Sequence, residues 1–111
     1  MLLNDVMPWL VAELRTLLLE NNEIELAQQV ASLTVVDRCS CGSDSCAMFY
    51  TAPKPYGAYG PGHRNVALSP ERGSLILDVV DGQIKAVEVL DREEVQKVLN
   101  QVTPRLLPRQ E

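Results

Sequence analysis

The sequence predicts an α+β fold, in which an N-terminal helical hairpin precedes an antiparallel sheet of four or five strands and a C-terminal helix. Three observations predict it. Apolar residues recur at helical spacing in residues 5–33, β-branched and alternating segments dominate residues 34–90, and a capped amphipathic pattern occupies residues 91–103. We expect a single domain over residues 1–111, with the helices covering one face of the sheet and an irregular tail at 104–111.

The first helix is predicted over residues 5–21, because apolar side chains recur there on one face. These side chains are Met7, Leu10, Val11, Leu14 and Leu18. Asn4 or Asp5 is expected to cap this helix, with Pro8 in the first turn, where its missing N–H costs little. The second helix of the hairpin is expected to end near Leu33.

The clearest strand signal is the pair Asp81-Gly82, which favours a two-residue hairpin turn between the apolar segments 75–80 and 83–90. Such a turn would oppose Val79 to Ile84, Asp78 to Lys85, Leu77 to Ala86 and Ile76 to Val87. If the face of the sheet away from the helices is uncovered, it carries an apolar patch and implies self-association or a partner. The patch would consist of Ile76, Val80, Val87 and Val89.

The segment 52–65 is predicted to be a long loop, because it is rich in proline and glycine. Loops of this length in small domains are often functional. Tyr56 and Tyr59 lie in it, and tyrosine suits recognition surfaces because its ring is rigid and its hydroxyl is polar. Tyr56 and Tyr59 are therefore the candidate partner-binding residues.

The chemically distinctive segment contains the three cysteines, Cys39, Cys41 and Cys46. Residues 34–39 and 46–51 are predicted to be strands joined by a turn at 42–45. Cys41 then faces Cys46 and Cys39 faces Met48, so that all three thiols lie on one face of the hairpin.

A metal interpretation adds His63 to the cysteines, since three thiolates and one imidazole form a Cys₃His zinc set. The strand must then bend, because side chains two residues apart on a regular strand are too far apart to share one ion. Two alternatives remain open. Cys41 and Cys46 can pair in a redox-responsive disulfide, or the three cysteines can pack as small reduced hydrophobes without further function.

Composition favours a small acidic cytoplasmic protein. The chain has 111 residues and a formal net charge of −5, and its basic residues are scattered, which argues against a nucleic-acid partner. No apolar stretch approaches the length of a membrane span, and no segment shows a catalytic signature. We therefore expect a protein-interaction or regulatory module without catalysis, or alternatively a cysteine cluster that binds zinc or responds to redox state. A homodimer through the exposed sheet face or the first helix is a further expectation.

Overall fold

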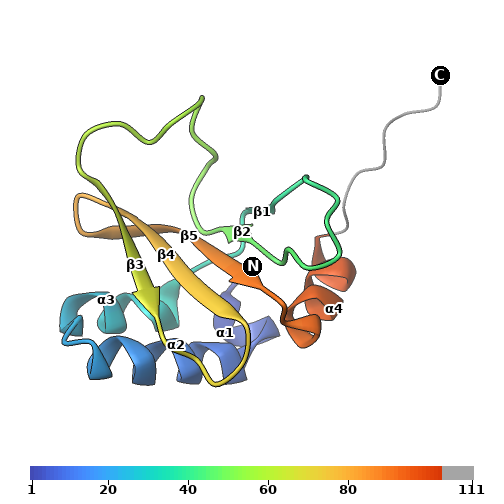
Figure 1. Cartoon of the computed structure of the whole chain (residues 1–111), viewed down its shortest axis with the longest axis horizontal. Helices are drawn as coiled ribbons and strands as arrows, with labels where there is room; N and C mark the ends of the chain where they lie inside the picture. Colours follow the sequence, from blue (N-terminus) through green and yellow to red (C-terminus); the bar gives the residue numbers. More distant parts are fainter. Residues whose placement is uncertain (104–111) are drawn as a thin grey trace.

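A five-stranded antiparallel sheet with strand order β1-β2-β5-β4-β3 organises residues 1–103, which are the residues that the computed structural model describes (Figure 1). The strands are β1 (Asp37–Arg38), β2 (Phe49–Tyr50), β3 (His63–Leu68), β4 (Ser74–Val80) and β5 (Gln83–Leu90). The helices are α1 (Leu3–Val6), α2 (Pro8–Glu20), α3 (Ile24–Gln29), the 3₁₀ turn η1 (Val30–Ser32) and α4 (Glu93–Val102). The predicted α+β class is confirmed, and the predicted tail at 104–111 lies outside the described residues.

The N-terminal helix is divided at Met7, which corrects the prediction of one continuous helix over residues 5–21. Met7 has φ −140° and ψ 63°, and Pro8 occupies the first turn of α2. A proline ring disfavours helical backbone at the residue before it, so the chain leaves the helix at Met7 and starts a new one at Pro8. The predicted caps are absent as well, since neither α1 nor α2 has a side-chain cap hydrogen bond.

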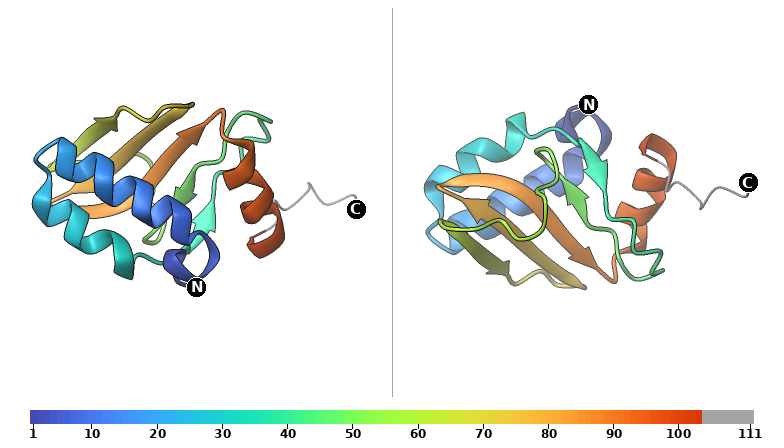
Figure 2. Two further views of the ribbon diagram at one scale, coloured as in Figure 1. Left: turned by 90° about the horizontal axis from the view of Figure 1, so that it is seen from below. Right: turned by 90° about the horizontal axis from the view of Figure 1, so that it is seen from above.

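The helices α2 and α3 cover one face of the sheet, as the two views in Figure 2 show. Their apolar face is buried against the strands, where each buried leucine contributes roughly 1.5–3 kcal/mol. The fully buried side chains of this layer include Leu10, Leu14, Leu18, Leu75, Leu77 and Val87. On the opposite face, here called the outer face, the segment between β2 and β3 crosses above β5 and β4 (Figure 2). This segment, residues 51–62, is named the covering loop.

A β-bulge in the hairpin β4–β5 overturns part of the predicted register. Val79 opposes Ile84 as expected, but the register then shifts, and Asp78 opposes Ala86 instead of Lys85. Lys85 is thus the extra residue of a bulge, and every later residue of β5 turns to the other face of the sheet. The predicted apolar patch is therefore wrong for Val87 and Val89, which are fully buried in the core, whereas Ile76 and Val80 lie on the outer face as predicted and are half-buried.

The hairpin that carries the cysteines has the predicted register but shorter strands. Asp37 opposes Tyr50 and Arg38 opposes Phe49, whereas the predicted strands extended over 34–39 and 46–51. Phe49 is fully buried, and it pairs with Val87 of β5. The hairpin is thereby attached to the middle of the sheet through β2.

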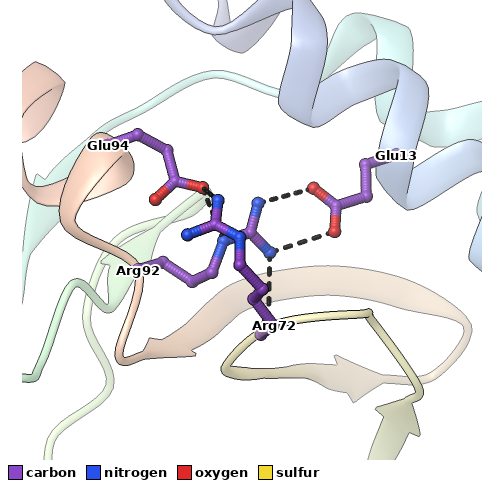
Figure 3. A network of polar contacts seen from close by, with 4 residues as sticks. All are labelled: Glu13, Arg72, Arg92 and Glu94. Atoms are coloured by element: carbon purple, nitrogen blue, oxygen red, sulfur yellow. Dashed lines mark hydrogen bonds and ion pairs between the residues drawn. The ribbon is translucent and has the colours of Figure 1, made fainter.

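A network of four charged side chains joins α2, the approach to β4 and the start of α4 (Figure 3). The side chain of Arg92 is only 5% exposed. Its two terminal nitrogens donate hydrogen bonds of 2.7 and 3.0 Å to the carboxylate of Glu13. Its Nε donates a hydrogen bond of 2.7 Å to the carboxylate of Glu94. Arg72 donates to the same oxygen of Glu94 over 2.6 Å. Two planar, parallel hydrogen bonds to one carboxylate fix the direction of a guanidinium group, so the network connects the start of α4 to α2.

Among residues 1–103, no helix has the length and apolar character that a membrane crossing requires.

Replacing Arg92 by methionine should lower the free energy of unfolding by about 2 kcal/mol, because Arg92 is 5% exposed and its charge-assisted hydrogen bonds to both Glu13 and Glu94 are lost. The matched control is Arg64→Met. Arg64 also binds a carboxylate in bidentate fashion, that of Glu23, but its side chain is 51% exposed, and such surface pairs contribute less than about 1 kcal/mol. Denaturant unfolding of both variants measures the difference, and equal losses would contradict the structural role assigned to the network.

Candidate metal centre

The three cysteines meet at one end of the sheet. The sulfur atoms of Cys39, Cys41 and Cys46 all lie within 4.8 Å of one another. The N–H of Cys39 donates to the carbonyl oxygen of Met48 over 2.9 Å, which continues the register of β1 and β2. The predicted gathering of the three thiols is confirmed.

The chain brings the thiols together by bending directly after Cys41. Gly42 has φ +79°, a left-handed conformation that glycine adopts without the steric cost of a side chain. A tight turn follows, in which the N–H of Cys46 donates to the carbonyl oxygen of Ser43 over 3.3 Å. The bend removes the difficulty that a regular strand would hold Cys39 and Cys41 too far apart for one ion.

Strand β5 holds the other side of this turn. Cys46 forms an isolated bridge with Leu90, and the N–H of Ala47 donates to Val89 over 2.8 Å. The N–H of Asp91 donates to the carbonyl oxygen of Ser45 over 2.9 Å. These backbone bonds attach the cysteine turn to the junction between β5 and α4, so the position of Cys46 depends on tertiary structure.

The three thiols differ in their surroundings. Cys41 is exposed, whereas Cys39 and Cys46 are half-buried. Burial raises the pKa of Cys46 to about 11, and hydrogen bonds with the other two thiols act in the same direction, against a lowering by the backbone at Met48. The thiolate of Cys46 is therefore disfavoured at neutral pH unless a positive charge compensates for it.

A metal ion is the natural source of that charge. Zinc binds cysteine thiolates at about 2.3 Å in a tetrahedron, which places neighbouring sulfur atoms about 3.8 Å apart. The observed cluster, with separations up to 4.8 Å, needs a contraction of at most about 1 Å to reach this geometry. The exposed thiol of Cys41 gives an ion a route from solvent.

His63 does not join the cysteines, which corrects the predicted Cys₃His set. It begins β3, the edge strand farthest from β1, and it opposes Val80 beside the β4–β5 turn. Three strand spacings of about 4.8 Å separate β2 from β3, and the cysteines lie at the opposite end of β5. The covering loop carries the chain across the sheet, so closeness in sequence to the cysteine hairpin does not become closeness in space.

His63 belongs instead to a polar cluster on the outer face that was not predicted from the sequence. Its Nε2 lies 2.8 Å from Oδ1 of Asp78, and the amide nitrogen of Asn65 donates to the same oxygen over 2.9 Å. Glu88 shares a hydrogen bond with Asp78. The predicted register, with Val87 and Val89 on the outer face, would place Glu88 on the helix-facing side, and the bulge at Lys85 is the reason why it turns outward.

The two tyrosines of the covering loop differ in exposure. The side chain of Tyr56 is fully exposed, whereas the hydroxyl of Tyr59 is buried, without a hydrogen-bond partner in the described part of the chain. The ring of Tyr59 packs on His63 with 4.9 Å between ring centroids. Tyr56 alone thus has the exposure that partner binding needs, and binding of a protein partner stays a prediction.

Comparison with family models, with curated proteins and with solved structures gives no match to this chain.

The surroundings of the thiols predict an order of chemical modification. With iodoacetamide at pH 8, Cys41 should react first and Cys46 at least tenfold more slowly, because the thiolate is the nucleophile and the pKa of Cys46 is raised to about 11. Peptide mass spectrometry of samples quenched at intervals measures each rate. Denatured protein is the control, in which the three rates should converge. Equal native rates at Cys41 and Cys46 would show that Cys46 is not shielded as described.

Proposed function

We propose that this protein is a metal-binding module that holds one zinc ion through the thiolates of Cys39, Cys41 and Cys46. The observation that carries the proposal is the approach of all three sulfur atoms to within 4.8 Å of one another. Thiolates are the ligands that zinc and other soft ions prefer in proteins. The three thiolates lie on one turn that backbone hydrogen bonds already hold in place. The turn therefore loses little further conformational entropy when it binds an ion.

The fourth coordination position would belong to a group from outside the cysteine cluster. In residues 1–103, no histidine or carboxylate side chain joins the three cysteines. Three protein ligands with an open fourth position leave room for water or for a group from another molecule. The fourth ligand of such a site exchanges readily. This property suits a protein that transfers its ion to another molecule better than it suits a purely structural zinc site.

The redox alternative predicts different chemistry for the same residues. A disulfide between Cys41 and Cys46 would remove two electrons and two protons, which an external oxidant must accept. The raised pKa of Cys46 works against this reaction, because a thiol that stays protonated attacks slowly. Metal binding has no such obstacle, since the ion displaces the proton and stabilises the thiolate.

The zinc proposal predicts one ion per chain in protein purified without added metal and without chelator. Replacing any one of Cys39, Cys41 and Cys46 by serine should weaken zinc binding at least tenfold, because a thiolate ligand is lost. The matched control is His63→Gln, which should leave stoichiometry and affinity unchanged. Elemental analysis and competition with a chromophoric chelator give both quantities. Added zinc should also raise the melting temperature of the wild-type protein, because it binds the folded state.

Two results would reject the proposal. Metal far below one ion per chain, together with three thiols that titrate freely and no gain in melting temperature on adding zinc, would leave the cysteines as packed side chains. One disulfide per chain in the isolated protein, reduced without release of metal, would favour the redox alternative. Loss of zinc in His63→Gln would show that the imidazole contributes after all.

A further inference from the structure

A fourth side chain that contains sulfur, that of Met48, stands on the same face of the sheet as the three thiols. The residues on either side of it, Ala47 and Phe49, are 1% and 0% exposed and belong to the core between the sheet and the helices. Successive side chains of a strand point to opposite faces. Met48, which is half-buried, therefore points to the outer face.

Two backbone contacts hold Met48 directly beside two of the cysteines. The N–H of Cys39 donates to the carbonyl oxygen of Met48 over 2.9 Å and continues the register of β1 and β2, so Cys39 opposes Met48. Opposed residues of two strands have Cβ atoms about 4.5–5.5 Å apart. On the other side, Cys46 precedes Met48 by two residues, and the backbone of Met48 hydrogen-bonds the thiol of Cys46. Met48 thus borders the cysteine cluster on two sides.

The other neighbours of the cluster offer no comparable ligand. Leu90, which opposes Cys46, is apolar. The hydroxyls of Ser43 and Ser45 lie 3.0 Å apart and share a hydrogen bond, and hydroxyl oxygen is not a ligand that soft metal ions prefer. Within the described chain, the cluster includes no imidazole and no carboxylate. The thioether of Met48, on an unbranched side chain with three rotatable bonds, is the donor best placed to complete a site.

A thioether discriminates between metal ions. The ligands that hold zinc in proteins are thiolates, imidazoles and carboxylates, and a neutral thioether is not among them. Cu(I) is a softer ion, and thiolate and thioether sulfur together are the ligand set that selects it. Three thiols and one thioether around a single turn therefore suit Cu(I) better than they suit zinc.

We propose that Met48 is a metal ligand that makes the cysteine site selective for Cu(I) over zinc. This inference rests on the proposed binding of a metal ion by Cys39, Cys41 and Cys46. When Cu(I) binds, each thiol gives its proton to solvent and forms a bond to copper. The thioether binds without losing a proton, and copper stays Cu(I), so no electron is transferred. Zinc at the same three thiolates leaves Met48 aside and keeps a ligand from outside in the fourth position.

Met48→Leu is the decisive variant, because leucine has a similar size and apolar character but no sulfur. We expect this variant to bind Cu(I) about tenfold more weakly than the wild type and to keep the wild-type affinity for zinc. Competition with a chromophoric chelator for each ion, with reduced full-length protein under anaerobic conditions, measures both affinities. The matched control is Met7→Leu. Met7 is fully buried in the helical layer, and its replacement should change neither affinity.

NMR of the methionine methyl groups tests the contact directly and needs a variant only for assignment. The chain has three methionines, and the signal that disappears in Met48→Leu belongs to Met48. In the wild-type protein this signal should shift far more with equimolar Cu(I) than with equimolar zinc, while the signals of Met1 and Met7 stay in place with both ions. Equimolar Cu(I) added to the zinc-loaded protein should also release the zinc, which a zinc indicator dye measures.

The outcomes separate this inference from the proposed function. A Met48 methyl signal that does not move when Cu(I) binds, or equal Cu(I) affinity in wild type and Met48→Leu, would overturn the role of Met48 and leave zinc binding by the cysteines intact. Equal losses for both ions in Met48→Leu would overturn it too, because Met48 would then only shape the turn. Failure of the wild-type protein to bind either ion would overturn the proposed function as well.

Discussion

The β-bulge at Lys85 is the constraint on which the rest of the structure depends, because β5 is the central strand of the sheet. One extra residue turns Val87 and Val89 toward the helices and turns Ala86 and Glu88 toward the outer face. β2 then pairs with β5 beyond the bulge, through Val87 and Ala86. The same register determines where the cysteine hairpin attaches and which carboxylates meet beneath the covering loop.

The cysteine site and the polar cluster apply one physical rule in two ways. A group that would be charged is placed where water is scarce, so the neutral form is favoured until a compensating charge arrives. At Cys46 that charge would be a metal ion that replaces the proton. At Glu88 it is the proton itself, held against Asp78. Both groups are thus sensitive to what binds them, and both lie beside the second half of β5, where Cys46 bridges Leu90 and Glu88 stands two residues before Leu90.

Much of the candidate metal centre was predictable because its geometry is local. Turn residues between two short apolar segments predict a reversal, and a reversal with Cys39 opposite Met48 brings all three thiols to one face. The sequence showed only that the chain must bend if Cys39 and Cys41 are to share one ion. In the structure the positive φ of Gly42 makes this bend. The placement of His63 was not predictable in this way, because a loop of twelve residues can return to either edge of a sheet.

The sequence by itself determined the α+β class, the order of helices and strands, the turn at Asp81-Gly82 and the gathering of the cysteines. These follow from hydrophobic period and turn chemistry, which act over a few residues. Tertiary structure alone decided the bulge, the strand order and the partner of His63, whereas the division of the first helix at Met7 follows from Pro8. A bulge turns the side chain of every later residue in the strand to the other face of the sheet. The apolar residues of the strand are compatible with either register, so the sequence does not show the bulge. For that reason the cluster around Asp78 and Glu88 became visible only in the folded chain.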